Sequence, residues 1–510
     1  MIKLAELLPD DVSSAEQLQQ IPDISIDGLK LDSRQVTHGD CFVAVPGYQM
    51  DGRHFVGQAI EAGARAVLQQ ANSFSVDARG AVPILCVPHL PEQLSAIAGR
   101  FYQHPSHRLS VVGVTGTNGK TTVTHLLAQL CQGLGKKAAV LGTLGSGFIQ
   151  GLLAEKNTTP DAFTVQARLA ALASEGADMV AMEVSSHALV QGRVNALQFS
   201  AVVATNVSRD HLDYHGSMES YAAAKEDLFN FYPVGARVYN LDDRQVREWF
   251  LRAAQGAFSY SLHEAADART LLATDLEYHD QGASFTLHWQ GQQYLAHSPL
   301  VGEFNVSNLL AAVATLLAHN FELAHIVPLL SDLKPVAGRM ETFSATGKPL
   351  AIVDYAHTPD ALEQVLKAAR SHCKGTLWCV FGCGGDRDRG KRPQMGAIAS
   401  QYADVVVVTD DNPRTEPPLT IIADIVSGMT GAARVVEHPG RQAAVLATLV
   451  QAGPDDVVVM AGKGHEDYQI IGAQRIDYNE RAVVETFMLG LEQEQPLGAT
   501  AHDENRKEPL

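Results

Sequence analysis

The sequence predicts an α/β protein of three domains: a small N-terminal α/β domain, a central domain built on a parallel sheet, and a C-terminal Rossmann-like α/β domain. Three observations support this prediction. The chain has 510 residues, too many for one compact core, because a domain averages about 150 residues. Short apolar runs alternate with helical patterns, which is typical of parallel strands joined by βα crossovers. The alternation stops near residue 337 and then resumes, which indicates a second, independent sheet.

Composition and charge restrict the functions open to this chain. Hydrophobic residues make up 46% and charged residues 19%, a globular composition. The net charge of −18 argues against nucleic-acid binding, which needs Lys and Arg in excess, and against docking on anionic lipid. We see no secretory signal and no apolar run long enough to cross a membrane. The six scattered cysteines predict free, buried thiols, so we expect a cytoplasmic protein.

The N-terminal domain is predicted at 1–106. Apolar runs at 40–47 and 64–70 alternate with turns, and the unit ends near the HPSHR segment at 104–108. The central domain is predicted at 107–336 and the C-terminal domain at 337–490. The polar tail at 491–510 is expected to be disordered.

The central domain begins with a buried strand at 109–115. Residues 270–297 alternate apolar and polar and predict a peripheral hairpin. The boundary at 330–341 carries Pro335 and Gly338. A helix is predicted at 305–319, and further strands are predicted at 138–142, 178–184 and 199–206 in this domain and at 350–356, 376–382, 404–410 and 456–462 in the C-terminal domain.

A glycine-rich turn directly follows the strand at 109–115 and opens a helix. In such a loop, backbone N–H groups and the helix N-terminus hold phosphate oxygens. The alternative is a structural turn, because Val114 stands where the usual first glycine would be. The pattern favours a nucleoside triphosphate site, with these expected ligands: Gly116, Thr117, Asn118, Gly119, Lys120, Thr121 and Thr122.

Two polar residues follow neighbouring strands of the central domain. Glu183 ends the strand at 178–184, and His211 follows the strand at 199–206. Because the carboxyl ends of parallel strands meet at one edge of a sheet, both are predicted beside the phosphate loop, where an acid can hold Mg²⁺. Lys225 lies in a helix at 217–229 capped by Ser217. Composition alone predicts an exposed, solvated lysine there.

Taken together, these motifs resemble those of the Mur ligases, in consistent order from about residue 29 to about 487. The segments that carry the resemblance are GTNGKTT, NTTPD (157–161), MEVSSHAL (182–189), NVSRDHLDYHG (206–216), the AAAK helix, NVSNLLAA (305–312), GRME (338–341), DYAHTPDAL (354–362) and GCGGDRDRGKRP (382–393). The resemblance implies an ATP-dependent amide-bond ligase of bacterial cell-wall precursor synthesis. Folylpolyglutamate-type relatives usually continue GTNGK with Gly-Ser, so Thr121 and Thr122 favour the Mur branch.

The resemblance also implies roles for individual residues. Lys225 matches a lysine that the family carbamylates, which would make it a Mg²⁺ ligand with Thr121, Glu183 and His211; the catalytic set would be Lys120, Lys225, Glu183 and His211. Further ATP contacts would come from Asn305, Arg339 and Asp354. The UDP-MurNAc-dipeptide would be held by Leu31, Ser33, Tyr48, Gln49, Met50, Asn157, Thr158, Thr159, Ser185, Gln191 and Arg193.

The amino acid that is added is suggested by a DNPR segment after the strand at 404–410. Read alone, Asn-Pro predicts a turn. In the family, DNPR is the pattern of enzymes that add meso-diaminopimelate, whose extra carboxylate suits a bidentate Arg. The implied ligands of this amino acid are Arg387, Asp411, Asn412, Pro413, Arg414, Gly462 and Glu466.

The expected reaction joins meso-diaminopimelate to the D-Glu γ-carboxylate of UDP-MurNAc-L-Ala-D-Glu through an acyl phosphate, using ATP and Mg²⁺. We expect a monomer that acts on small molecules. Two alternatives stay open: a related ligase, either one that adds L-lysine or one of the folylpolyglutamate type, and a nucleotide-gated binding ATPase without ligase activity.

Overall fold

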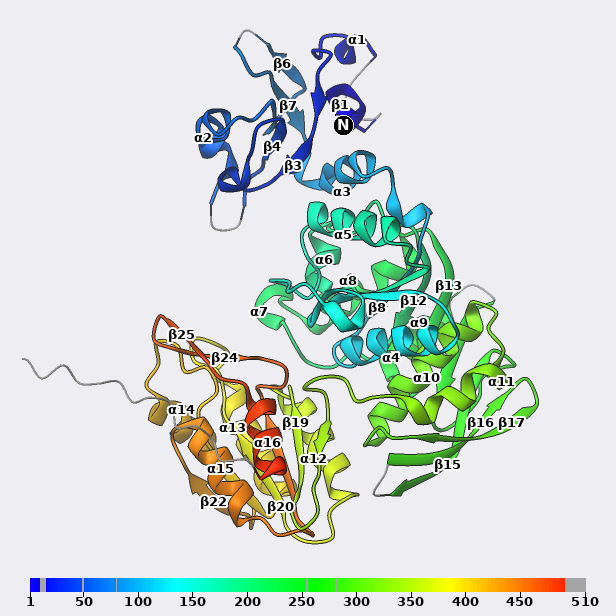
Figure 1. Cartoon of the computed structure of the whole chain (residues 1–510), viewed down its shortest axis with the longest axis vertical. Coiled ribbons are helices and arrows are strands. Elements are labelled where there is room, and N and C mark those ends of the chain that lie inside the picture. The colour runs from blue at the N-terminus through cyan, green and yellow to red at the C-terminus, as the bar shows by residue number, and fades with distance from the viewer. Residues whose placement is uncertain (10–14, 48–49, 79, 254–255, 280–281, 491–510) are drawn as a thin grey trace, which may run out of the picture. The chain divides into compact units, whose positions relative to one another are not determined.

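The computed structural model describes residues 1–9, 15–47, 50–78, 80–253, 256–279 and 282–490. The chain forms two compact units, Met1–Val336 and Ala337–Leu510 (Figure 1). The first unit holds the N-terminal and central domains, and the second holds the C-terminal domain. The tail at 491–510, predicted to be disordered, lies outside the described residues.

The N-terminal domain is a five-stranded sheet with a helix on each face. Its order is β3-β4-β5-β7-β6, parallel except for β6. Phe42 packs with α2 on one face, whereas its neighbour Val43 packs with α3 on the other, as the two-residue period of a strand requires. The elements are β1 (Ile2–Lys3), α1 (Ala15–Leu18), β2 (Ser25–Ile26), β3 (Gly28–Lys30), β4 (Asp40–Ala44), α2 (Val56–Glu61), β5 (Ala66–Ala71), β6 (Ser75–Asp77), β7 (Ile84–Pro88) and α3 (Leu90–Phe101).

The central domain contains a ten-stranded sheet in the order β10-β9-β11-β8-β12-β13-β14-β15-β16-β17. Val112 and Val114 pack against α4 and α10, and Val111 packs toward α5 on the opposite face. The predicted strands are confirmed: β8 (Ser110–Thr115), β9 (Ala138–Gly142), β11 (Met179–Glu183) and β12 (Phe199–Ala204). The other elements are α4 (Lys120–Gly133), β10 (Gly145–Gly147), α5 (Ala162–Ser174), α6 (Ser186–Val190), α7 (Leu212–His215), α8 (Met218–Asn230), β13 (Val234–Asn240), α9 (Arg244–Arg252), β14 (Phe258–Ser261), α10 (Glu303–Ala318) and α11 (Leu323–Ile326).

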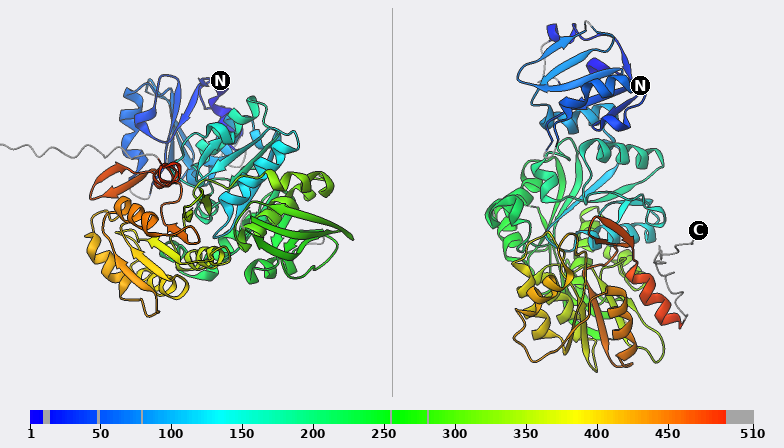
Figure 2. Two further views of the ribbon diagram at one scale, coloured as in Figure 1. Left: turned by 60° about the horizontal axis from the view of Figure 1, so that its bottom comes forward. Right: turned by 90° about the vertical axis from the view of Figure 1, so that its left-hand side faces the viewer.

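The segment predicted as a peripheral hairpin is instead part of the main sheet. It forms β15 (Thr270–His279), β16 (Gly282–Trp289) and β17 (Gln292–Ser298), drawn in green in Figure 2. β15 pairs in parallel with β14, and β16 and β17 follow antiparallel. Alternating residues such as Leu271 and Phe285 join the core under α10. The alternation in the sequence indicated one buried face, but not what that face packs against.

The C-terminal domain is a six-stranded sheet in the order β18-β19-β23-β20-β21-β22, parallel except for β18. The helices α12, α13 and α14 pack on one another, and α15 packs with α16 on the opposite face of the sheet (Figures 1 and 2). The four predicted strands appear as β19 (Leu350–Asp354), β20 (Leu377–Phe381), β21 (Val405–Val408) and β23 (Val457–Ala461). The other elements are β18 (Glu341–Phe343), α12 (Pro359–Arg370), α13 (Lys391–Tyr402), α14 (Pro418–Val426), β22 (Arg434–Glu437), α15 (Arg441–Gln451), β24 (Tyr468–Ile471), β25 (Gln474–Asp477) and α16 (Glu480–Leu489).

All six cysteines carry free thiols. Four are buried as predicted, whereas Cys86 and Cys373 are half-buried. Burial raises the pKa of the Cys41 thiol to about 12, so this thiol stays protonated and behaves as a small hydrophobe. Among the described residues, no helix is long and apolar enough to cross a membrane.

Candidate nucleotide and amino-acid sites

The glycine-rich loop connects β8 to α4, as predicted, and two of its glycines are required by close approach. Gly116 has φ of 148°, and a Cβ there would lie 1.9 Å from Thr205 Oγ1. Gly119 has φ of 86°, and a Cβ would lie 2.3 Å from Asn308 Oδ1. Only glycine tolerates both the positive φ and the contact. Asn206 then fixes the loop, since it accepts hydrogen bonds from two loop amides at 2.8 and 2.9 Å.

Lys120 and Thr121 begin α4 directly after this loop. Lys120 Nζ donates to two carbonyl oxygens of the loop, both at 2.9 Å. Thr121 Oγ1 donates to Glu183 Oε1 at 3.0 Å, and Thr143 donates to the same carboxylate through its backbone N–H and its hydroxyl. Glu183 is only 1% exposed. Among the described residues, only neutral groups donate to this buried carboxylate, and no cation pairs with it. Because buried charges are usually paired or bound to a metal, the site fits a Mg²⁺ ion held by Glu183 and the Thr121 hydroxyl.

Lys225 is buried at 1% exposure on the inner face of α8, so the prediction of a solvated helical lysine is wrong. Its Nζ donates to the carbonyl oxygen of Gly116 at 2.8 Å and lies 4.5 Å from the ring centre of Tyr221. No carboxylate of the described residues pairs with it. Burial, reinforced by the positive charge of Lys120, holds the pKa of Lys225 well below its usual value.

His211 lies next to this group, at the first residue before α7, with φ of 53°. Its ring contacts those of His187 and Tyr221, at centroid distances of 4.8 and 6.2 Å. Burial lowers the pKa of His211, and the cations of Lys120 and Lys225 act in the same direction. The described residues contain no group of three or more His, Cys, Asp or Glu side chains that could hold a metal. Of the four predicted metal ligands, only Glu183 and His211 are of these residue types. A metal site here would therefore also need oxygen ligands from Thr121 and from a modified Lys225.

Asn305 lies in the first turn of α10 and is 3% exposed. Its Nδ2 donates to the carbonyl of Val301 at 2.8 Å, and its Oδ1 accepts from Asn308 at 3.3 Å. Because Asn308 Oδ1 also packs under Gly119, α10 supports the glycine-rich loop from behind.

The residues predicted to hold the UDP-sugar divide between the N-terminal and central domains. Ser33 is buried and donates to Gln58 at 3.0 Å, and Leu31 packs at the edge of the N-terminal core. Met50 is 63% exposed, and its carbonyl oxygen accepts a hydrogen bond from the amide of Gly47. Tyr48 and Gln49 lie outside the described residues.

The predicted dipeptide-binding residues form one connected chain in the central domain. Arg193 donates to Gln191 Oε1 at 2.6 Å and to the carbonyl of Thr159 at 2.6 Å. The Thr159 hydroxyl contacts Ser185, which caps α6. Thr158 Oγ1 lies at hydrogen-bond distance, 3.1 Å, from Oγ1 of Thr143, the residue that holds Glu183, while Asn157 is exposed. The dipeptide candidates and the candidate metal ligands are therefore linked through one network.

In the second unit, Asp354 ends β19 and both its carboxylate oxygens accept backbone N–H bonds at 2.7 Å, from Met340 and Ala356. Burial raises the pKa of this carboxyl, against the opposing effect of Arg339. Arg339 stacks on the ring of Tyr355 at 4.5 Å. Asp354 therefore anchors the loop that carries Arg339.

Arg414 and Arg387 approach the same glycine. A Cβ on Gly384 would lie 2.9 Å from Arg414 Nη1 and 3.6 Å from Arg387 Cγ. Arg414 is half-buried at φ of 51°, and its Nη1 donates to the carbonyl of Gly385 at 2.8 Å. Arg387 is exposed. The two guanidinium-bearing side chains thus come from two loops to one place, whereas Arg389 pairs with Asp424 on the surface.

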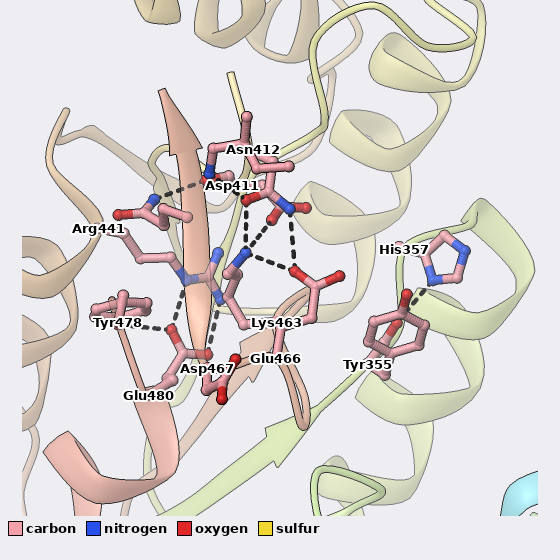
Figure 3. Close-up of polar contacts among 12 residues, drawn as sticks. Tyr355, His357, Asp411, Asn412, Arg441, Lys463, Glu466, Asp467, Tyr478 and Glu480 are labelled. Atoms are coloured by element: carbon pink, nitrogen blue, oxygen red, sulfur yellow. Dashed lines mark hydrogen bonds and ion pairs between the residues drawn. The ribbon is translucent and has the colours of Figure 1, made fainter. Parts of the chain in front are cut away.

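The remaining amino-acid candidates surround a lysine that sequence reasoning missed (Figure 3). Lys463 is fully buried and pairs with Glu466 at 2.7 Å and Asp411 at 3.3 Å. Asn412 accepts from Lys463 and donates to Glu466. Gly462, with φ of 111°, lies against Asp411, and Pro413 is buried. The signal for Lys463 was its place between Gly462 and Glu466, directly after a predicted strand.

A second buried ion pair lies beside this cluster. Arg441 and Glu480 are both fully buried and bonded, and Tyr478 donates to Glu480 at 2.9 Å. Arg441 also donates to the carbonyls of Asp410 and Ala461. It therefore ties together the ends of the strands that lead to Asp411 and Lys463.

Comparison with known proteins agrees with this architecture. Family models match residues 25–102 (Mur ligase family, catalytic domain), 114–316 (Mur ligase middle domain) and 338–464 (Mur ligase, glutamate ligase domain). A solved UDP-N-acetylmuramoyl-L-alanyl-D-glutamate–2,6-diaminopimelate ligase is 37% identical, with a TM-score of 0.68, over 96% of this chain and 99% of that one.

Two more distant structures share the fold. The MurF ligase of Thermotoga maritima, in complex with ADP, is 17% identical, with a TM-score of 0.62 over 91% of this chain and 96% of that one. A folylpolyglutamate synthase of Mycobacterium tuberculosis, complexed with ADP and AMPPCP, is 17% identical, with a TM-score of 0.60 over 79% and 96%.

Fold and site together define an ATP-dependent ligase built from three α/β domains. The chain belongs to the Mur ligase family, the ligases of peptidoglycan synthesis.

Proposed function

We propose that this protein joins meso-diaminopimelate to the D-Glu γ-carboxylate of UDP-MurNAc-L-Ala-D-Glu with hydrolysis of ATP to ADP and phosphate. The observation that carries the proposal is the approach of the Arg414 guanidinium and the aliphatic stem of Arg387 to Gly384. The 37% identical relative, whose name specifies 2,6-diaminopimelate, supports the same substrate.

Binding of ATP is assigned to the loop between β8 and α4. Its amides and the N-terminus of α4 face the phosphates, and Lys120 contributes a positive charge to them. Asn305, Arg339 and Asp354 are the further residues proposed to contact the nucleotide. The Arg339–Tyr355 stack holds the guanidinium in place for this contact.

Mg²⁺ is assigned to Thr121, Glu183, His211 and Lys225 after carbamylation. When bound, Mg²⁺ neutralises charge on the phosphates and orients them. The side chain of Lys225 suits carbamylation, since its amine is buried and lacks a carboxylate partner. In that reaction the ammonium first loses one proton, the neutral amine attacks CO₂ to form a C–N bond, and a second proton leaves, so that a cation becomes an anion.

The reaction proceeds in two steps. First, the γ-carboxylate of the bound dipeptide attacks the γ-phosphate of ATP, which yields an acyl phosphate and ADP. Then the amine of diaminopimelate attacks the acyl carbon and phosphate leaves. Lys120 and Arg193 supply positive charge to the developing anions. Arg193 is held for this by Gln191 and by the carbonyl of Thr159.

The choice of amino acid is assigned to the second unit. Arg414 and Arg387 bind the distal carboxylate, which L-lysine lacks. Lysine would leave a half-buried guanidinium without its anion, at a cost of several kcal/mol when one partner of a buried pair is missing. Glu466, with Asp411, Asn412, Pro413 and Gly462, surrounds the distal ammonium.

We also propose that the protein works as a cytoplasmic monomer on small-molecule substrates. The test of the function is phosphate release from ATP and Mg²⁺ with UDP-MurNAc-L-Ala-D-Glu, with meso-diaminopimelate or L-lysine added in parallel. We expect release, and a tripeptide product, only with diaminopimelate. Phosphate release with L-lysine would support the ligase reaction but would reject the role of Arg414 in selecting diaminopimelate. Release without the UDP-sugar would reject the ligase reaction.

A further inference from the structure

Lys463 is the centre of a closed set of polar contacts at the carboxyl end of β23. An ammonium group has three N–H donors. Lys463 donates to Glu466 Oε2 at 2.7 Å and to Asn412 Oδ1 at 2.9 Å, and Asp411 Oδ1 lies within ion-pair distance at 3.3 Å. The side chain is fully buried. The positive charge of Lys463 is therefore balanced by these three residues rather than by water.

The two carboxylates around Lys463 are incompletely bonded. Asp411 is 8% exposed, and its Oδ1, although within ion-pair distance of Lys463, makes no hydrogen bond among the described residues. Glu466 uses Oε2 for both Lys463 and Asn412, and no bond to its Oε1 is formed by the described residues. The missing bond at Asp411 Oδ1 is unfavourable because this oxygen is buried, and both Asp411 Oδ1 and Glu466 Oε1 can accept a donor from a ligand.

The net charge of the cluster also favours a positively charged ligand. Asp411 and Glu466 contribute −2 and Lys463 contributes +1, which leaves −1 in a mostly buried place. One additional ammonium would bring the sum to zero. Buried charges are tolerated when they are paired, so the cluster is suited to a ligand with a single positive group at this point.

Asn412 fixes the arrangement further. Its Oδ1 accepts from Lys463 and from the backbone N–H of Ile470, both at 2.9 Å, while its Nδ2 donates to Glu466 at 3.0 Å. These bonds determine the orientation of the amide. Asn412 and Lys463 together therefore hold Glu466 from two sides, with one of its oxygens turned to neither of them (Figure 3).

We propose that Lys463 is a positioning residue that holds Asp411 and Glu466 as a preformed subsite for the distal ammonium of the amino-acid substrate. This inference rests on the proposed function. Lys463 itself binds no substrate: its charge prevents the two carboxylates from repelling each other, and its bonds keep them in place before the ligand arrives. The neighbouring Arg441 holds the backbone from which two of these residues project.

The experiment compares meso-diaminopimelate with L-2-aminopimelate, which has the same reacting amine and distal carboxylate but no distal amine. The KM of each is measured with saturating ATP and UDP-MurNAc-L-Ala-D-Glu. In the parent protein we expect KM for aminopimelate to be about 10- to 100-fold higher, since charge-assisted hydrogen bonds are lost. In Lys463→Met we expect the two KM values to differ by less than about threefold, with KM for ATP unchanged.

A loss of protein stability would change the KM values of both amino acids by the same factor. The ratio of the two KM values therefore separates a positioning role of Lys463 from a defect in folding. Lys463→Gln, which retains an N–H donor but no charge and leaves Asp411 and Glu466 intact, offers a second test if the first variant is unstable. We expect its ratio to fall as well, because the positive charge that holds Asp411 and Glu466 is lost. Lys367→Met is the matched control: this lysine is exposed, pairs with Glu363 on α12, and should leave the ratio unchanged.

The outcomes separate the two proposals. A parent that discriminates strongly between the two amino acids, with Lys463 variants that discriminate equally well, overturns the positioning role and leaves the proposed function intact. A parent that releases phosphate with neither amino acid overturns both. A ratio that falls only in the Lys463 variants supports the inference.

Discussion

Lys225 Nζ and Lys120 Nζ donate to the same acceptor, the carbonyl oxygen of Gly116, at 2.8 and 2.9 Å. Two ammonium groups around one oxygen repel each other, and Lys225 is the more deeply buried of the two. Burial and this repulsion together hold the pKa of Lys225 well below its usual value. A neutral amine at this place is the form that reacts with CO₂.

The role of Lys225 is tested by its replacement with alanine. We expect kcat to fall by at least about 100-fold, because the variant lacks the carbamate that is proposed to bind Mg²⁺ and to offset the positive charge of Lys120. Small carboxylates such as acetate should restore part of the activity. Lys136→Ala, which removes an exposed lysine of the same unit, is the control. Full activity of Lys225→Ala would reject the carbamate.

The role of Arg414 is tested by measuring KM for each substrate of Arg414→Ala. Loss of a charged hydrogen bond to the distal carboxylate should raise KM for diaminopimelate about 10- to 100-fold, while KM for ATP stays nearly constant. The preference over lysine should shrink by a similar factor. Arg370→Ala, at a surface ion pair with Asp404, should change neither. An equal rise in KM for ATP would indicate a structural role instead.

The stability of the protein in acid should depend on His465. Burial, together with the cations of Arg339, Arg481 and Lys463, lowers the pKa of His465 to about 3. Its Nδ1 is buried without a hydrogen bond, and its ring lies 4.9 Å from that of Tyr355. Between about pH 6.5 and about pH 3, the unfolded chain binds a proton that the folded chain does not, so stability falls as pH falls.

We therefore expect His465→Phe to reduce this acid sensitivity. Phenylalanine retains the ring contact with Tyr355 but cannot take up a proton. Thermal unfolding scans at pH 7 and pH 4 should show a smaller drop in Tm for the variant than for the parent, by several degrees. At pH 7 the two should differ little. An identical drop in Tm for the variant and the parent would show that His465 does not contribute to the acid sensitivity.

Much of the site could be predicted because it lies where sequence and topology are tightly coupled. Gly116, Lys120 and Thr121 are consecutive or nearly so, and their roles depend on one turn between a strand and a helix. Glu183 ends a neighbouring strand, and in a parallel sheet the ends of neighbouring strands meet at one edge. The bond between Thr121 and Glu183 follows from that rule.

Lys225 and Lys463 could not be assigned in this way. Whether a lysine on a helix or after a strand is solvated depends on what packs over it, and that comes from distant parts of the chain. Tyr221 and Gly116 enclose Lys225, whereas Asp411 and Asn412 reach Lys463 from about fifty residues away. The attachment of β15 to β14 was missed for the same reason.

By itself, the sequence determined the fold class, the glycine-rich loop between a strand and a helix, most strands and the family, because these depend on local periodicity and on short, ordered motifs. Only the tertiary structure decided which charged side chains are buried and which carboxylates are left incompletely bonded. Burial is a property of packing between distant segments, and the free energy of a charge depends on whether that packing removes water and supplies a partner.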